Sequence, residues 1–422
     1  MTQPRVITLG CRLNTFESEV MRELARGGGR DAGLDDAIII NTCAVTAEAE
    51  RQARQTIRRL ARDNPDARII VTGCAAQLNP DAFSEMEEVH RVLGNEEKLD
   101  PDLLAGAGPD VQVADIMTVR ETAPHLISGI EGRTRAFVQI QQGCDHRCTY
   151  CIIPFARGPN RAVAADAVVA QVQTLVETGY KEVVLTGVDI CSYGGDAADG
   201  QALSDLVGRV LAEAPELERL RLSTLDPAAI DDGLLRLFAE QSRLMPHLHL
   251  SLQAMDDTIL KRMKRRHSRA DAFETVRRAR EARPDAVFGA DLIAGFPTET
   301  DEMFDNSLSA VGDLGLAHLH VFPYSPRPGT PAARMPEVSG DIRKVRAAKL
   351  RTAGDKELRR FLDSRAGTTA QVLVEKDRQG LSQHYATVKL DFDADPGVIV
   401  EARVTAAGDD YLVGSRVGGR AA

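Results

Sequence analysis

The sequence predicts an α/β protein in three parts: an N-terminal βα domain with a parallel sheet, a central partial barrel of six βα units, and a small C-terminal β-barrel. Two series of short Val- and Ile-rich runs alternate with longer helical stretches, which is typical of parallel sheets. Near residue 366 the pattern changes to alternating apolar residues with many Val, Thr and Gly, which favours antiparallel strands. We expect domains at 1–108, 133–365 and 366–422, with a linker at 109–132.

In the first domain we expect three strands and two helices. The strand-like runs are at 6–9, 37–40 and 68–72, and the helical stretches at 14–26 and 47–63. Strands separated by helices indicate βαβ units, so the three strands should lie parallel.

The second series carries six strand candidates, at 137–141, 182–186, 219–223, 248–252, 287–293 and 317–322. Helical stretches such as 166–178 and 269–283 lie between them. Six units predict an open barrel rather than a closed eight-stranded one, with its chemistry at the carboxyl ends of the strands. A charged helix at 341–362 leads into the last domain, whose strand-like runs include 371–375 and 397–404.

Composition narrows the classes of protein. No apolar run approaches the roughly 18–20 residues that span a bilayer, and the first ten residues lack signal-peptide architecture, so we expect a cytoplasmic protein. The formal net charge is -10, so a nucleic-acid partner would need local basic patches. Seven cysteines without an export signal favour metal or catalytic use over disulfides.

Three of these cysteines, Cys144, Cys148 and Cys151, follow the first strand of the central series in a Cys-x-x-x-Cys-x-x-Cys pattern. Thiolates are the ligands that iron–sulfur clusters need, and three of them leave one iron of a four-iron cluster free to bind an amino acid. Structural zinc requires four ligands, and His146 inside the tight loop is an awkward fourth. Three unrelated core cysteines are the remaining alternative.

A second triad, Cys11, Cys43 and Cys74, has one cysteine just beyond each of the first three strands. The intervals of 32 and 31 residues match one βα unit each, so the three can converge at one edge of a parallel sheet. Free cysteines are often only small buried apolar residues, which is the alternative here. Cys191 has no partner in either triad, and we interpret it as structural.

The central cysteine motif, with Tyr150 before its last cysteine, resembles the signature of radical S-adenosylmethionine (SAM) enzymes. The segment 151–158 is similar to that of the methylthiotransferase family, in particular the tRNA threonylcarbamoyladenosine methylthiotransferases. Further landmarks of that family are similar to the segments 185–189, 221–227, 249–253, 291–300 and 320–330.

The resemblance implies a radical SAM core and a C-terminal TRAM-like domain. It implies two [4Fe–4S] clusters: one on Cys144, Cys148 and Cys151 that reduces SAM to a 5′-deoxyadenosyl radical, and an auxiliary one on Cys11, Cys43 and Cys74 that carries sulfur. A second SAM would supply the methyl group. The residues expected to contact the cofactor are Tyr150, Thr186, Gly187, Asp189 and Gln253.

The implied reaction adds a methylthio group to carbon 2 of N6-threonylcarbamoyladenosine at position 37 of tRNA. Isopentenyladenosine of tRNA and an aspartate of a ribosomal protein are alternative substrates, and a non-enzymatic iron–sulfur RNA-binding protein is the alternative class. The implied partners are the tRNA anticodon loop and a reductant such as flavodoxin or ferredoxin. The sulfur donor stays open.

For RNA contact the sequence offers a basic run at 261–269, with six basic residues in nine. Clustered positive charge suits phosphate contacts, although a solvated helix face would look the same. The expected RNA-binding residues are Lys261, Arg262, Lys264, Arg265 and Arg266. The stretch 341–360 has eight basic and three acidic residues, whereas 366–422 has six basic and eight acidic ones, which is unusual for an RNA-binding module.

Overall fold

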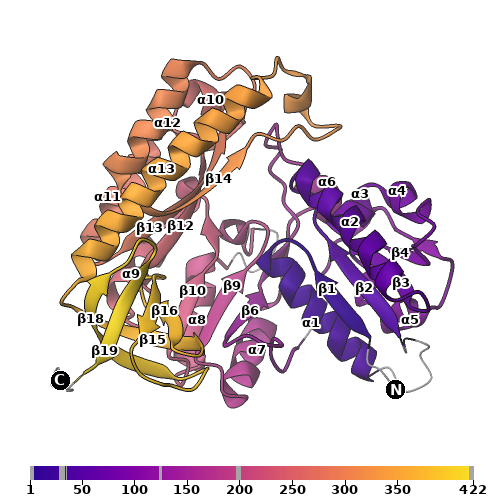
Figure 1. Cartoon of the computed structure of the whole chain (residues 1–422), viewed down its shortest axis with the longest axis horizontal. Coiled ribbons are helices and arrows are strands. Elements are labelled where there is room, and N and C mark those ends of the chain that lie inside the picture. Colours follow the sequence, from indigo (N-terminus) through magenta and orange to yellow (C-terminus); the bar gives the residue numbers. More distant parts are fainter. Residues whose placement is uncertain (1–3, 28–33, 35, 123–125, 196–200, 418–422) are drawn as a thin grey trace.

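The computed structural model describes residues 4–27, 34, 36–122, 126–195 and 201–417. It confirms the α/β fold in three parts (Figure 1). In that view the N-terminal domain lies to the right of the core, and the C-terminal barrel lies below it on the left. Within the described ranges, no helix combines the length and the apolar character that crossing a membrane requires.

The N-terminal domain has a five-stranded parallel sheet whose strands lie in chain order. The strands are β1 (Arg5–Thr8), β2 (Ala37–Thr42), β3 (Arg68–Gly73), β4 (Arg91–Leu93) and β5 (Val111–Gln112). The helices are α1 (Arg12–Gly27), α2 (Ala47–Asp63), α3 (Cys74–Leu78), α4 (Pro80–Ser84) and α5 (Pro101–Ala105). Strand β5 pairs with β4, so the segment expected as a linker contributes an edge strand to this sheet.

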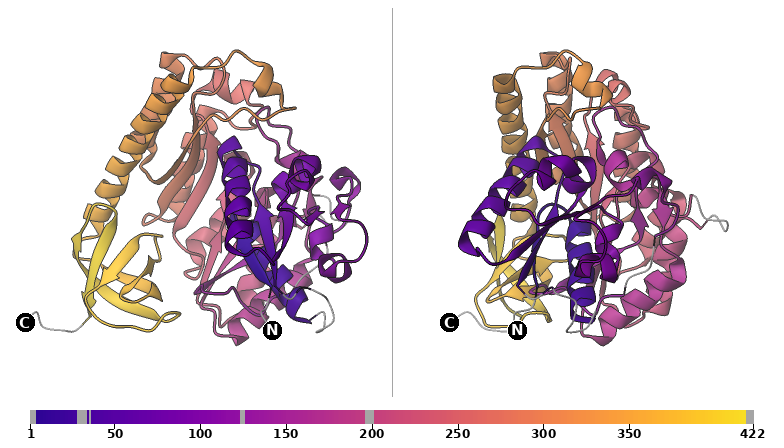
Figure 2. Two further views of the ribbon diagram at one scale, coloured as in Figure 1. Left: turned by 45° about the vertical axis from the view of Figure 1, so that its right-hand side comes forward. Right: turned by 90° about the vertical axis from the view of Figure 1, so that its right-hand side faces the viewer.

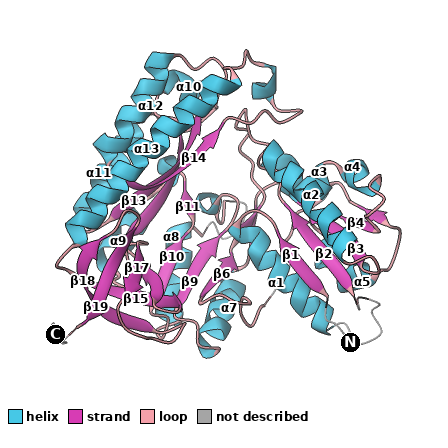
Figure 3. Cartoon of the chain, viewed as in Figure 1, coloured by secondary structure: helices cyan, strands magenta, loops and turns pink. Residues whose placement is uncertain are grey.

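The core contains the six expected strands and one short additional strand, β11, in two parallel sheets (Figure 3). One holds β6 (Arg135–Gln139), β9 (Glu182–Thr186) and β10 (Arg219–Leu222), and the other holds β11 (Thr224–Leu225), β12 (His247–Gln253), β13 (Val287–Ala294) and β14 (Leu316–Pro323). An isolated bridge pairs Leu220 of β10 with Leu244, three residues before β12. Among the described strands, β6 and β14 each have a single neighbour, so the barrel is open between them.

Helices cover the outer face of the core strands. They are α7 (Ala165–Glu177), α8 (Leu203–Glu213), α9 (Asp232–Glu240), α11 (Arg269–Ala282), α12 (Asp301–Leu314) and α13 (Gly340–Arg365). On β12, Leu248, Leu250 and Leu252 belong to the core beneath these helices. Because side chains alternate along a strand, the intervening His249 and Ser251 face the inside of the barrel.

Shorter elements follow the carboxyl ends of the strands: β7 (Gln141–Gln142), α6 (Ile153–Arg157), β8 (Arg161–Ala162) and α10 (Asp257–Arg262). Strands β7 and β8 pair antiparallel beyond β6. They bracket the cysteine loop at 144–151, so this loop is held at the carboxyl end of β6.

The C-terminal domain is a closed five-stranded barrel at the end of α13 (Figure 2). Its strands are β15 (Thr369–Lys376), β16 (Gln379–Ser382), β17 (Thr387–Leu390), β18 (Ile399–Ala407) and β19 (Tyr411–Arg416). Closure leaves no free strand edge, and Leu362 of α13 packs into the same apolar core.

Tyr385, in the turn between β16 and β17, joins all three parts. Arg12 of the N-terminal domain donates to its hydroxyl over 3.0 Å, and its ring stacks on His247 of the core at 4.8 Å between centroids. Arg221 donates to the carbonyls of Ser382 and Gln383. These contacts close the amino-terminal end of the barrel from below.

Candidate functional site

The N-terminal cysteines stand at the carboxyl ends of three adjacent strands. Cys11 precedes α1, Cys43 follows β2, and Cys74 begins α3 directly after β3. A Cβ atom added to Gly10, whose φ is +107°, would lie 2.6 Å from Cβ of Cys43. The Cys11 loop therefore approaches Cys43 so closely that only glycine fits next to it.

These three thiols differ in exposure. Cys43 and Cys74 are buried, whereas Cys11 is exposed. Burial, together with neighbouring Cys74, raises the pKa of Cys43 to about 12. Without a metal, Cys43 therefore stays a neutral thiol at physiological pH, and binding a metal there releases its proton.

Arg157 of α6 reaches from the core into this triad. Its Nε donates to Sγ of Cys74 over 3.2 Å, and its other nitrogens donate to Glu17 at 2.6 and 3.0 Å. Asn14 accepts a further bond at 2.6 Å, and Lys98 pairs with Glu17 at 2.7 Å. The charges of Arg157, Lys98 and Glu17 are almost fully buried, so the two cations are balanced by one carboxylate and by the dipoles around them.

Glu17 shows the strength of this network. Burial alone would raise its pKa, but the charges of Arg157 and Lys98 lower it to about 2. Sequence reasoning assigned no role to Glu17 or Lys98 and included Arg157 only within the family-like segment 151–158, because isolated charged residues carry no pattern that predicts burial.

The central cysteine loop folds tightly at the end of β6. The backbone N–H of Cys144 donates to Gly158, and that of Cys151 donates to Cys148, both over 3.0 Å. Gly143 has φ +71°, and a Cβ there would lie 1.8 Å from the carbonyl oxygen of Pro159. Glycine is therefore required where the loop returns past its own start.

A carboxylate and a guanidinium both lie beside this loop. Burial, together with the negative charge of neighbouring Asp189, raises the pKa of Cys144 to about 12. Arg265 lies with Nη1 3.7 Å from Sγ of Cys148. Each triad thus has one arginine at one of its sulfurs.

Each triad offers three thiols, which is the donor type that four-iron clusters take. His146, the only side chain considered above as a fourth zinc ligand, pairs instead through Nε2 with Asp189 at 3.0 Å. His146 is thus engaged with a carboxylate beside the central loop rather than with its sulfurs.

The expected cofactor contacts lie around the same end of the barrel. Thr186 is buried at the end of β9, and a Cβ on Gly187 would lie 2.8 Å from the Gln141 carbonyl. Gln253 ends β12 with φ +66°. Tyr150 packs edge-to-face on Phe296, which follows the carboxyl end of β13, with centroids 6.4 Å apart.

Asp189 is fixed by its neighbours. Burial alone would raise its pKa, but hydrogen bonds from His146 and Ser192 hold it below its ordinary value. The side-chain oxygen of Gln141 accepts from the N–H groups of Val188 and Asp189 at 2.9 and 2.8 Å. Gln141, which sequence reasoning also missed, therefore shapes the loop after β9.

The basic run at 261–269 does not form one solvated surface. Lys261 and Lys264 are exposed, and Arg266 is partly exposed while paired with Asp226 at 3.0 Å. Arg262 donates to Oγ1 of Thr298 over 2.8 Å. Arg265 turns inward, with 8% of its side chain exposed, because it contacts Cys148 and the same Asp226.

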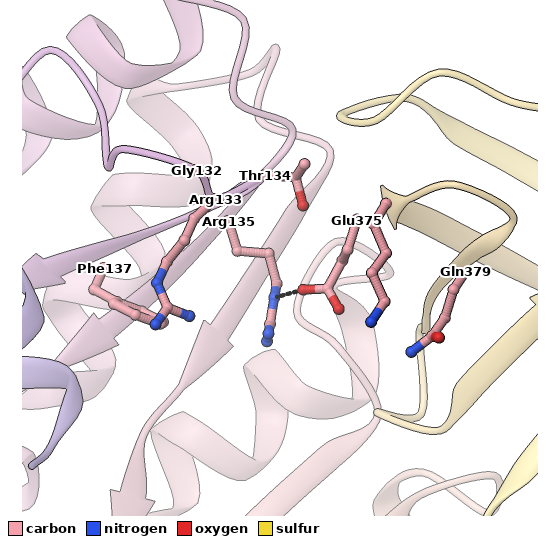
Figure 4. A pocket seen from close by; sticks show the side chains of 8 residues that line it. Gly132, Arg133, Thr134, Arg135, Phe137, Glu375 and Gln379 are labelled. Carbon is pink, nitrogen blue, oxygen red and sulfur yellow. Dashed lines mark hydrogen bonds and ion pairs between the residues drawn. The ribbon is translucent and has the colours of Figure 1, made fainter.

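A pocket of about 290 Å³ lies at the opposite end of β6, between the core and the C-terminal barrel (Figure 4). Arg133, Arg135 and Lys376 line it, and Arg135 pairs with Glu375 at 2.9 Å. It is separate from the cysteine loop, which follows the other end of the strand.

Comparisons with known proteins agree with this architecture. The model of the radical SAM superfamily matches residues 138–311, and that of the uncharacterized protein family UPF0004 matches residues 4–94. Among solved structures, the radical SAM methyltransferase TsrM from Kitasatospora setae is similar, with a TM-score of 0.56 and 16% identity, over 79% of this chain and 75% of that one. That likeness shows the fold, and together with the matched model it defines a radical SAM protein.

The curated relatives are more specific. The threonylcarbamoyladenosine tRNA methylthiotransferase MtaB of Rickettsia prowazekii is 48% identical over 96% of both chains. MtaB of Bacillus subtilis is 32% identical over 97% of this chain and 95% of that one. The tRNA-2-methylthio-N(6)-dimethylallyladenosine synthase of Erythrobacter litoralis is 32% identical over 97% of this chain and 96% of that one. The chain belongs to the family of the threonylcarbamoyladenosine tRNA methylthiotransferases.

Proposed function

We propose that this chain adds a methylthio group to carbon 2 of N6-threonylcarbamoyladenosine at position 37 of tRNA. The observation that carries the proposal is the pair of three-cysteine sites in two domains, which Arg157 joins through its bond to Cys74. The 48% identity to a named MtaB favours this nucleoside over isopentenyladenosine.

We assign the cluster that binds SAM to Cys144, Cys148 and Cys151, and the sulfur-carrying cluster to Cys11, Cys43 and Cys74. Together, SAM and the two clusters would supply the sulfur, the methyl group and the radical that activates an inert adenine C–H bond. The protein supplies orientation and exclusion of water.

Particular side chains of this protein provide the orientation and the exclusion of water. Gln141 holds the backbone after β9, and Arg265 places positive charge at Cys148. Arg157, Glu17 and Lys98 seal the contact between the two cluster domains against solvent. The exposed Cys11 leaves its triad open on one side.

For partners, we assign tRNA contact to the exposed Lys261, Lys264 and Arg266. Electrons come from a small reductant of the flavodoxin or ferredoxin type, and the reaction takes place in the cytoplasm, where tRNA is modified.

The test is an anaerobic assay of the reconstituted protein with SAM, dithionite, sulfide and tRNA from cells that lack this protein. Mass spectrometry of the nucleosides should show 2-methylthio-N6-threonylcarbamoyladenosine. A matched tRNA carrying isopentenyladenosine is the control. Methylthiolation of that control alone would contradict the proposed substrate.

A further inference from the structure

The inner face of the open barrel carries a cluster with no role so far. His249 on β12, Asp291 on β13 and His320 on β14 lie on adjacent strands. Nε2 of His249 and Nδ1 of His320 both approach Oδ1 of Asp291, at 2.9 and 3.0 Å. One carboxylate oxygen therefore orients two imidazole rings, which lie 4.6 Å apart.

On the inner face of the barrel, side chains of β14 are accessible to solvent. His320 is 56% exposed and Phe322 is 41% exposed, although both lie on a strand of the core. Val321, which lies between them, and Leu319, which precedes them, pack against the helix-covered core, Leu319 next to Gly354 of α13. Because side chains alternate along a strand, His320 and Phe322 point the other way, into the barrel. In Figure 1, β14 faces the side on which the N-terminal domain lies.

Ser251 and Arg265 connect this cluster to the cysteine loop. Ser251 is two residues after His249 on β12, about 7 Å along the strand, and it accepts a bond from Arg265. Arg265 in turn contacts Cys148. On the other side, His247 and His318 are covered by Tyr385, which closes the barrel below.

We propose that Phe322, His320 and Asp291 form the site that recognises the target nucleoside: Phe322 stacks on the adenine ring, and the Asp291–His320 pair binds the N–H groups of the N6 substituent. The proposal rests on the function given above and adds to it the residues that select the substrate.

The chemistry of these groups supports an N6-acylated adenosine. Aromatic side chains that are exposed beside a nucleic-acid site provide stacking surfaces for unpaired bases. Among the described residues, Oδ2 of Asp291 has no hydrogen-bond donor, because both histidines bind Oδ1. With Nδ1–H of His320 donated to Asp291, its Nε2 is a second acceptor. A carbamoyl linkage offers two N–H groups to two acceptors, whereas an isopentenyl group offers one.

The experiment uses the holoenzyme and three anticodon stem-loop RNAs that differ only at position 37, which carries threonylcarbamoyladenosine, isopentenyladenosine or adenosine. Product formation and affinity, by fluorescence anisotropy, are measured for wild type, Phe322→Ala, Phe322→Tyr and Asp291→Asn. Ile342→Ala, an exposed apolar residue on α13, is the control. Iron per chain equal to wild type shows that each variant is folded.

We expect Phe322→Ala to weaken binding of all three RNAs about tenfold, and Phe322→Tyr to restore it. Asp291→Asn replaces an acceptor with a donor at nearly the same shape, so the preference for the threonylcarbamoyl RNA should fall about tenfold. Ile342→Ala should match wild type.

Unchanged affinity in Phe322→Ala together with unchanged preference in Asp291→Asn would overturn the proposal. The three ligand atoms also lie within 4.8 Å of one another, a spacing that suits a metal ion. One equivalent of a metal other than iron, lost in Asp291→Asn, would overturn it too. If wild type forms no product on any RNA, the proposed function fails, and the affinities of wild type and Asp291→Asn for the three RNAs still decide this site.

Discussion

Nε of Arg157 donates to Sγ of Cys74 over 3.2 Å, although the two residues belong to different domains. Arg157 follows Cys151 by six residues, so a single short segment provides a cysteine of one triad and a hydrogen bond to a cysteine of the other. The bond couples the position of the core loop to that of the N-terminal sheet.

The first prediction concerns this bond. Reduction potentials of iron–sulfur clusters depend on net charge and on hydrogen bonds to sulfur. Arg157→Leu should therefore lower the midpoint potential of the N-terminal cluster and leave that of the core cluster unchanged, as measured by redox titration with electron paramagnetic resonance. Arg58→Leu, on the exposed face of α2, is the control. Equal shifts in both clusters would show that the bond does not act locally.

The second prediction concerns the buried carboxylate between two cations. Glu17→Gln leaves Arg157 and Lys98 buried without their counter-charge, a change that typically costs about 3–5 kcal/mol. Thermal denaturation of the holoenzyme should show a fall of about 5–10 °C. Glu48→Gln, at an exposed ion pair of α2, should shift the midpoint by less than about 2 °C. A drop of equal size in both would argue against the network.

The same carboxylate predicts an acid dependence. Because the folded-state pKa of Glu17 is about 2 and its ordinary value is 4.5, its stabilisation is present above pH 4.5 and is lost as pH falls toward 2. Wild type should lose stability over that interval more steeply than Glu17→Gln, measured by chemical denaturation at each pH. Parallel curves would assign the acid dependence to other groups.

The third prediction separates the two triads. The reconstituted protein should hold about eight iron atoms per chain, and replacing Cys144, Cys148 and Cys151 together by Ala should leave about half. Cys43→Ala should still form 5′-deoxyadenosine but no methylthio-nucleoside, and Cys148→Ala should form neither. One anaerobic assay with both products quantified by mass spectrometry measures this.

Cys191→Ala is the matched control for that assay, because Sγ of Cys191 accepts a bond from the N–H of Asp226 rather than joining a triad. It should keep all the iron. Methylthio transfer at the wild-type rate by Cys43→Ala would make the N-terminal triad merely structural.

The fourth prediction concerns RNA contact. Lys261→Glu combined with Lys264→Glu should weaken tRNA binding and flatten its dependence on salt, because fewer counterions are released. Filter binding across a salt series measures both, and Lys181→Glu, on the surface between α7 and β9, is the control. An unchanged salt slope in the double variant would mean that this surface does not contact tRNA.

Arg265→Gln should behave differently, because its side chain contacts Cys148 and Asp226 rather than solvent. The variant should have a lower iron content and a slower cleavage of SAM, whereas its affinity for tRNA should change less. Some side chains of the basic run thus point to solvent and others point into the core. A count of charges along the sequence does not detect this difference.

Spacing along the chain determined much of this protein. The six core strands, the helix into the C-terminal barrel and the placement of Cys11, Cys43 and Cys74 beyond successive strands all follow from periodicity, because parallel βα units place successive strand ends at one edge. The cysteine loop at 144–151 follows from three thiols in eight residues, a density that favours a shared ligand.

Tertiary structure alone decided which polar side chains meet. Arg157 and Cys74 are 83 residues apart, and Arg12 and Tyr385 are 373 apart, so no local pattern records either contact. The same holds for His249, Asp291 and His320, which become neighbours only because β12, β13 and β14 pair side by side, with Asp291 opposite His320. A sequence determines which residues can form each element, whereas the partner of a buried charge depends on which elements pack together, since burial without a partner costs too much free energy to persist.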